Sequence, residues 1–181
     1  MLRNVKQVYN GFGQIYSLSI EMDGVLVDRE IYHRGDAVAV VLYDPTKNRV
    51  ILTNQIRPGV LKNESERTNC FELVAGMIDG DMTAIDAIKA EALEEVGYNI
   101  NPQYVMKFYT SPGAYSERIH LFYAEVSYED KIALGGGNGH ENENIEIYSI
   151  SLDLALASID SGIIDDAKTI IGLQWLKNRR R

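Results

Sequence analysis

Alternation of apolar and polar residues predicts strands in the first third of the chain. Residues 14–34 (QIYSLSIEMDGVLVDREIYHR) alternate on both sides of a central Met-Asp-Gly turn, which is typical of a β-hairpin. AVAVVLY at 37–43 predicts a further, more apolar strand. RVILTNQIRP at 49–58 predicts the next strand and carries Arg57 to its end. Residues 58–69 are polar, so we expect a loop there.

A helix is predicted over the stretch from Thr83 to Gly97. Thr83 followed by Asp86 fits a capping pair, and Gly97 is a natural left-handed stop. Helical spacing gathers four apolar side chains into a stripe that should face the core: Ile85, Ile88, Ala92 and Val96. Three carboxylates collect beside this stripe: Glu91, Glu94 and Glu95.

This acidic cluster opposes helix formation. Like charges at i, i+4 repel by about 0.2–0.5 kcal/mol. Anions in the last turn also face the negative end of the helix dipole, at about 0.3–1 kcal/mol. A divalent cation bound by carboxylate oxygens would offset both, and the small side chains of Ala84 and Ala87 leave room for it and for a phosphate. A solvated acidic face is the alternative, and the helix alone does not decide between the two.

The remainder of the chain supplies more strands and then helices. Strands are predicted from residue 105 to a turn at 111–113, at 118–126 and at 145–151. A glycine-rich loop is predicted at 135–144, and helices at 152–161 and 167–180. This order favours an α+β fold, a sandwich of mixed sheets with helices outside.

Composition places the chain among soluble globular proteins. It has 181 residues, of which 45% are hydrophobic and 24% charged, enough for one domain with a full core. The longest apolar run, 37–43, is far shorter than a membrane span, and the first residues lack the apolar segment of a signal peptide. We therefore expect a cytoplasmic protein that does not contact a membrane. Cys70 is the only cysteine and should be a small buried hydrophobe.

The net charge limits the classes of molecule that the protein is expected to bind. A net charge of −8 and a pI near 4.9 argue against a non-specific nucleic-acid surface, because a polyanion is not attracted. A small anionic substrate would need local arginine or lysine and a metal ion.

The stretch from Gly76 to Tyr98 resembles the Nudix box: Gly, five residues, Glu, seven residues, Arg-Glu, apolar, any, Glu-Glu, any, Gly, apolar. The matching positions are Gly76, Glu91, Ala92, Glu94, Glu95, Gly97 and Tyr98. Two positions depart, because Met82 stands where the family has its first Glu and Ala90 where it has Arg. Losing both charges leaves neither unpaired. The acids that bind metal in the family are intact, which favours an active variant.

Beyond the box the chain resembles the ADP-ribose pyrophosphatase branch of the Nudix hydrolases. The matching segments are REIYHRG at 29–35, QIR at 55–57, ELVAGMI at 72–78, SPGAYSER at 111–118, HENENI at 140–145 and IDDAKTIIGLQWL at 164–176. The resemblance implies a Nudix-type α/β/α sandwich. It also implies Mg²⁺-dependent hydrolysis, with Mn²⁺ as a substitute, of a nucleoside diphosphate sugar such as ADP-ribose to a nucleoside monophosphate and a sugar phosphate.

The resemblance assigns the chemistry to carboxylates. Metal ligands would be the backbone carbonyl of Ala75 and the side chains of Glu91, Glu94 and Glu95, with Glu94 also counted as catalytic. Glu141 would be the base that activates water, with Glu143 in a lesser part. An acid outside the metal set suits that task, because metal binding lowers the pKa of a carboxylate and occupies its lone pairs.

Substrate contacts follow from the same resemblance. Arg57 would clamp phosphate with its planar fork. The other predicted substrate-binding residues are Phe12, Arg29, Glu30, Met77 and Glu117. Residues 1–35 would form an N-terminal β-strand region that pairs two chains into a homodimer, and 36–181 would form the Nudix hydrolase domain.

Two alternatives stay open. GDP-mannose hydrolases share much of the pattern, including the Ser-Pro-Gly turn, so the base and the sugar are not decided. A non-catalytic nucleotide-binding module would fit the departures at Met82 and Ala90, although retention of every presumed metal carboxylate argues against it.

Overall fold

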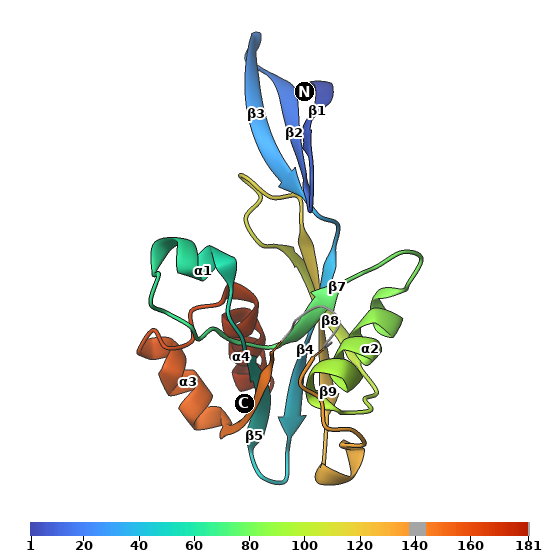
Figure 1. Ribbon diagram of the computed structural model, residues 1–181, viewed down its shortest axis with the longest axis vertical. Coiled ribbons are helices and arrows are strands. Elements are labelled where there is room, and N and C mark those ends of the chain that lie inside the picture. The colour runs from blue at the N-terminus through green and yellow to red at the C-terminus, as the bar shows by residue number, and fades with distance from the viewer. Residues whose placement is uncertain (138–143, 181) are drawn as a thin grey trace.

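A computed structural model describes residues 1–137 and 144–180, and it shows two sheets of very different surroundings (Figure 1). The larger sheet has seven strands: β4 (Ala37–Asp44), β5 (Arg49–Asn54), β6 (Phe71–Glu72), β7 (Val74–Met77), β8 (Gln103–Tyr109), β9 (Arg118–Glu125) and β10 (Glu146–Ser151). Their order is β10-β5-β4-β9-β8, with β6 paired to β5 and β7 paired to β4. β4 and β9 run parallel, and the other pairings are antiparallel.

Strand β4 lies at the centre of the body and is buried along its whole length. Alternate side chains enter two different cores, because successive residues of a strand point to opposite faces. Val38, Val40 and Leu42 pack with helix α2 (Ala84–Val96). Ala39 and Val41 pack on the other face, with α3 (Leu152–Asp160) and α4 (Ala167–Arg179). The predicted α/β/α sandwich is therefore confirmed.

Helix α2 begins and ends where its capping residues predict. The Thr83 hydroxyl accepts a hydrogen bond from the Asp86 N–H at 3.2 Å. Gly97 adopts φ of 78°, and a Cβ there would lie 2.0 Å from the Ala133 carbonyl oxygen. The predicted core stripe is wrong at Ile85, because this residue is 46% exposed.

The sequence predicts a loop over residues 58–69, but part of this segment is helical. Pro58–Asn63 forms the short helix α1, with proline in its first turn, where a fixed φ favours helix entry. None of its residues is buried, so no apolar spacing could reveal it. A single 3₁₀ turn, η1 (Tyr128–Asp130), completes the helical elements among the described residues.

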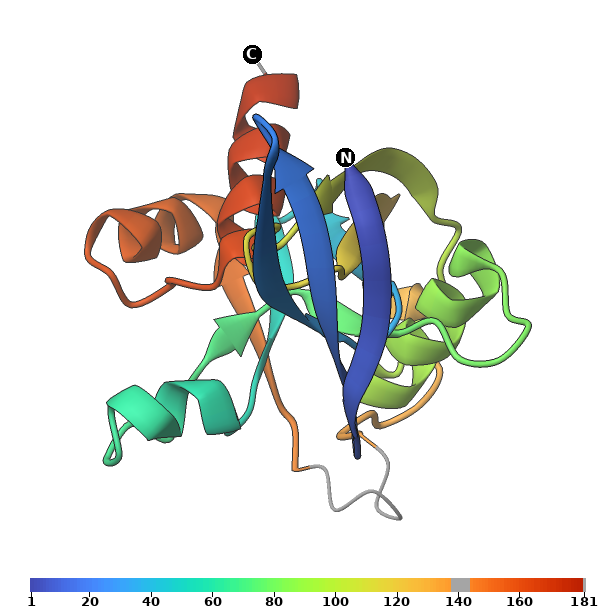
Figure 2. The ribbon, with the colours of Figure 1, turned by 90° about the horizontal axis from the view of Figure 1, so that it is seen from above.

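The N-terminal sheet stands away from the body in Figure 1, and Figure 2 looks down on it from above. Its three antiparallel strands are β1 (Leu2–Asn10), β2 (Gln14–Met22) and β3 (Val25–His33). The predicted hairpin is β2–β3, closed by Asp23 and Gly24, both with positive φ as a two-residue hairpin turn requires. β1 extends this hairpin by one strand.

Few backbone hydrogen bonds join this sheet to the body. The Tyr32 N–H donates to the Ala114 carbonyl at 2.8 Å, and the Ser116 N–H donates to the Tyr32 carbonyl at 3.2 Å. The loop between β8 and β9 therefore continues the sheet at the end of β3. No helix in the part of the chain that the structure describes is long and apolar enough to cross a membrane.

Candidate active site

Helix α2 carries two of the three predicted metal-binding acids to one stretch of backbone. Glu95 is 3% exposed, and its Oε2 accepts a hydrogen bond from the Ala75 N–H at 3.3 Å. The Glu91 carboxylate lies over Gly76, because a Cβ at Gly76 would be 1.9 Å from its Oε1. Glu94 is exposed on the same helix. Strand β7 therefore brings Ala75 and Gly76 directly to Glu91 and Glu95, as the predicted site requires.

The donor set fits a hard divalent cation. Carboxylate and carbonyl oxygens are the ligands that Mg²⁺ and Mn²⁺ prefer. Within residues 1–137 and 144–180, no three His, Cys, Asp or Glu side chains are gathered closely enough to hold a metal by themselves. Glu91 and Glu95 instead surround a backbone segment whose carbonyl, at Ala75, is the fourth predicted ligand. The set thus combines side chains of α2 with the backbone of β7.

Arg57 lies beyond the end of β5 as the N-cap residue of α1, and not within the strand as predicted, and its charge interacts with that of Glu95. Its Nε donates to Glu72 Oε2 at 2.6 Å, and its side chain is 39% exposed. Burial works to lower the pKa of Arg57, but the carboxylates of Glu72 and Glu95 outweigh it and the pKa is raised. Arg57 therefore stays cationic near Glu95, one of the predicted metal ligands, and this position suits a phosphate contact.

Two charged residues of this region, Glu72 and Lys168, were not predicted as functional candidates. Glu72 is 4% exposed and accepts hydrogen bonds from both Arg57 and Lys168. The sequence signal was present, because both residues stand in segments that match the Nudix branch, ELVAGMI and IDDAKTIIGLQWL. Their contact could not be read from it, since 96 positions separate them.

The predicted nucleotide-side residues lie around the N-terminal sheet and its junction with the body. Phe12 is 85% exposed, and the Arg34 guanidinium lies 4.1 Å from its ring centroid. Both line an open pocket of about 290 Å³ formed by residues 11–14 and 33–35. Arg29 and Glu30 are exposed on β3, on opposite faces of the sheet.

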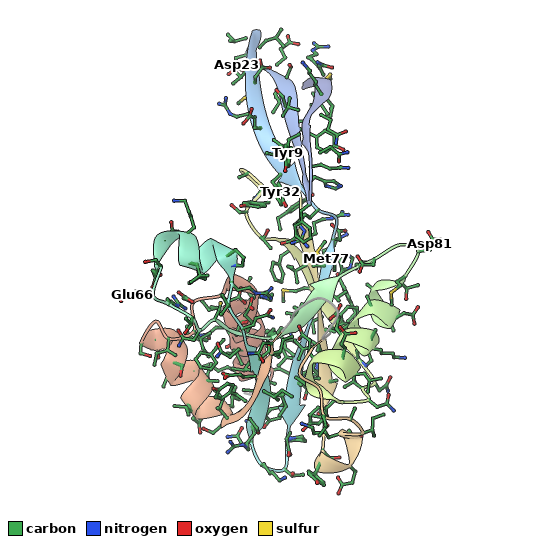
Figure 3. All side chains as sticks on the ribbon, in the orientation of Figure 1. Tyr9, Asp23, Tyr32, Glu66, Met77 and Asp81 are labelled. Atoms are coloured by element: carbon green, nitrogen blue, oxygen red, sulfur yellow. The ribbon has the colours of Figure 1, made fainter. Side chains whose placement is uncertain are left out.

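Met77 and Glu117 connect the pocket region to the body. Figure 3 shows Met77 at the end of β7, below Tyr32 of β3. A Cβ at Gly35 would lie 3.6 Å from Met77 Cε, so this side chain packs at the joint between the two sheets. Glu117 is half-buried in the loop that pairs with β3.

The remaining predicted residues fall outside these clusters. Glu141 and Glu143 lie outside the described residues. Met82 and Ala90 are both exposed, so the departures from the box leave no buried position without its charge. Cys70 is buried as predicted, and burial raises the pKa of its thiol to about 11, which makes a nucleophilic role unfavourable.

Comparison with known proteins identifies the family to which the chain belongs. Residues 33–168 match the NUDIX domain, so the chain belongs to the NUDIX family, as the box predicted. The GDP-mannose pyrophosphatase of Cronobacter sakazakii is 40% identical over 160 residues, which cover 87% of this chain and 82% of that protein. The GDP-mannose pyrophosphatase of Pectobacterium atrosepticum is 37% identical over 162 residues, covering 88% and 82%.

A solved structure extends the likeness to the N-terminal sheet. The crystal structure of an ADP compounds hydrolase superposes with a TM-score of 0.78, covering 99% of this chain and 95% of the other. The identity is 20%, so this likeness concerns the fold. The predicted α+β Nudix fold is confirmed by it.

Proposed function

We propose that this NUDIX enzyme hydrolyses the diphosphate of GDP-mannose or a closely similar nucleoside diphosphate sugar, releasing a nucleoside monophosphate and a sugar phosphate. The observation that carries the proposal is the placement of Glu91 and Glu95 over the Ala75–Gly76 backbone, with the cationic Arg57 beside Glu95. Acids and an arginine at one place suit a substrate whose phosphates need both a metal and a direct cationic contact.

The metal would be held by Glu91, Glu94, Glu95 and the Ala75 carbonyl. When bound, a divalent ion neutralises phosphate charge and lowers the pKa of a coordinated water. Mg²⁺ is the proposed ion, and Mn²⁺ should replace it because both favour oxygen ligands. Glu94 is exposed beside the buried Glu95, which places it on the side of α2 open to a substrate.

Arg57 would clamp a phosphate, held in place by its bond to Glu72. Phe12, Arg29 and Glu30 would contact the nucleoside, and Met77 and Glu117 would contact the substrate between the nucleoside and the box. Glu141 would take the proton from water, with Glu143 contributing less. Replacing each of the last two by Gln should cut kcat far more for Glu141 than for Glu143, with metal dependence unchanged.

The choice of sugar nucleotide follows the relatives. Both named relatives are GDP-mannose pyrophosphatases, which favours GDP-mannose over the ADP-ribose that the sequence segments first indicated. A panel of GDP-mannose, ADP-ribose and other sugar nucleotides, run with Mg²⁺ and with EDTA, tests this. The expected result is metal-dependent release of GMP, with GDP-mannose giving the highest kcat/KM. Binding without hydrolysis across the whole panel would instead indicate a non-catalytic nucleotide-binding module.

We further propose that two chains associate through residues 1–35, leaving 36–181 as the hydrolase domain, in the cytoplasm. One face of the N-terminal sheet is mostly apolar, although Gln7 and Arg29 also lie on it. Strand register places on this face Leu2, Val5, Tyr16, Leu18, Ile20, Met22, Val25, Val27 and Ile31. Val5 is 51% and Val25 62% exposed, so no described residue of the same chain covers the face there. A second copy of the same sheet would bury it symmetrically.

A further inference from the structure

Glu72 is a buried carboxylate shared by two cations. Its Oε2 accepts from Arg57 Nε at 2.6 Å, and its Oε1 accepts from Lys168 Nζ at 2.5 Å. The Glu72 side chain is 5% exposed, whereas the Arg57 side chain is 39% exposed. Arg57 therefore extends from a buried anchor toward the surface of the site.

Lys168 reaches Glu72 from the first turn of α4, which is itself fixed to the strand that carries Glu72. Lys168 Nζ also lies 3.1 Å from Asp166 Oδ1. The Leu73 N–H donates to Thr169 Oγ1 at 2.8 Å. Burial works to lower the pKa of Lys168, but Glu72 and Asp166 outweigh it and the pKa is raised. Lys168 is thus a charged, fixed group.

The second cation decides what Glu72 can do. A buried carboxylate facing one arginine alone would draw that guanidinium inward, away from the surface of the site. With Oε1 held by Lys168, only Oε2 faces Arg57, and the bond is made to Nε. A guanidinium held at Nε has the plane of its fork fixed. A fixed plane is what recognition of a phosphate requires.

We propose that Glu72 and Lys168 are positioning residues for Arg57: Lys168, carried by the first turn of α4, holds the Glu72 carboxylate in place, and Glu72 sets the plane of the guanidinium that meets the diphosphate. The inference rests on the proposed function, in which Arg57 binds phosphate. It makes the C-terminal helix part of the substrate-binding apparatus.

The test measures anion binding separately from catalysis. Inorganic pyrophosphate is titrated in EDTA into the parent, Lys168→Met, Arg57→Gln and the double variant, and GDP-mannose kinetics are measured with Mg²⁺. Lys168→Met should weaken pyrophosphate binding by about 10- to 100-fold, the range expected when a hydrogen bond to a charged group is lost. It should raise KM more than it lowers kcat. In the Arg57→Gln background the same change should have no further effect, because Lys168 acts through Arg57.

Further variants separate positioning from stability. Lys168→Arg keeps the charge and should recover most of the affinity. If Lys168→Met folds poorly, Lys168→Met with Glu72→Gln removes the buried pair together; this variant should fold and still bind pyrophosphate weakly. Thr169→Val loosens α4 without changing charge at Glu72, and should lower Tm while leaving the affinity within about twofold. Arg67→Met removes a cation that pairs with Asp165, and should likewise leave it unchanged.

Three results would overturn the inference. An additive loss in the Arg57→Gln background would mean that Lys168 contacts the phosphate itself. Parent-like affinity in Lys168→Met would mean that Glu72 needs only one cation. Equal pyrophosphate affinity in the parent and in Arg57→Gln would remove Arg57 from phosphate binding. A parent that binds pyrophosphate through Arg57 but cleaves no sugar nucleotide would refute the proposed function and leave the positioning role standing.

Discussion

Strands β4 and β1 occupy opposite extremes of burial in one chain. Every residue of β4 is buried, and every residue of β1 is exposed. β4 has helices and core on both faces, whereas neither a helix nor a second layer covers the N-terminal sheet in the described part of the chain (Figure 1). Both sheets nevertheless present apolar side chains, so the difference lies in what covers them.

That difference separates two kinds of stability. The body buries its own apolar surface, at about 25 cal/mol per Å² removed from water. A small sheet needs packing on its hydrophobic face for independent stability. No described part of the chain packs on the apolar face around Val5, Leu18 and Val25, so we expect a second copy to supply this packing. The body should therefore be stable at any protein concentration, and the N-terminal sheet should depend on association.

The largest stability difference should come from matched core and surface truncations. Phe122 is 1% exposed, and Phe122→Ala should cost about 3–5 kcal/mol through lost burial and a cavity. Leu26 is 65% exposed on the more polar face of the N-terminal sheet, and Leu26→Ala should change stability by less than about 0.5 kcal/mol. Urea unfolding of both variants measures this. Losses of similar size would erase the distinction between the two regions.

A charge on the apolar face should break association. Val5→Asp places a carboxylate where a second copy would pack, and should weaken dimerisation by about 2 kcal/mol or more, as for a central interface residue. The neighbouring Asn4→Asp adds the same charge on the opposite face and serves as the control. Sedimentation over a concentration series measures both. Equal assembly of the two variants would mean that the apolar face is not the interface.

An added methyl group should lower stability and turnover at Gly76, where the space is occupied, and should change little at Gly59, where the space is open. Gly76→Ala puts a methyl group 1.9 Å from the Glu91 carboxylate, and should cost about 1–3 kcal/mol of stability and lower turnover. Gly59→Ala, in α1, meets no atom within 4 Å and is the control. Thermal melts and initial rates of both variants are the measurement. A parent-like Gly76→Ala enzyme would mean that Glu91 is not held against β7.

The smallest effect should be the response of the body to acid. Burial works to raise the pKa of Asp36, but Arg118 and His120 outweigh it, so its pKa lies below the ordinary 3.8. A depressed pKa stabilises the fold above the ordinary value, and this contribution is lost as pH falls below 3.8 through the folded value. Asp36→Asn should therefore reduce the pH dependence of Tm in that range. An unchanged pH profile would show that the ion pair contributes nothing.

The sequence predicted the elements that are determined by residues close together in the chain, and it failed where contacts between distant residues decide the structure. β4 and α2 were predicted because an apolar run and the caps Thr83 and Gly97 act within a few residues. Ile85 was misplaced, since helical spacing gives the direction of a side chain and not what lies opposite it. α1 was missed because it buries nothing.

The candidate site divides in the same way. Glu91 and Glu95 were predicted from the box, and the structure brings them to the Ala75–Gly76 backbone. The contact between Glu72 and Lys168 joins residues 96 positions apart in the sequence, so it forms only when the body is packed. The roles given to Glu141 and Glu143 stay predictions.

The central claim is that the box acids of α2 support metal-dependent hydrolysis in the body, and Glu95→Gln tests it most directly. The change keeps volume and removes one charge from a residue that is 3% exposed. Metal stabilisation of phosphate chemistry is worth several kcal/mol, so GDP-mannose turnover at saturating Mg²⁺ should fall by about a hundredfold or more, with Tm in EDTA equal to the parent's or slightly higher. A variant that folds like the parent and cleaves GDP-mannose as fast would contradict the account.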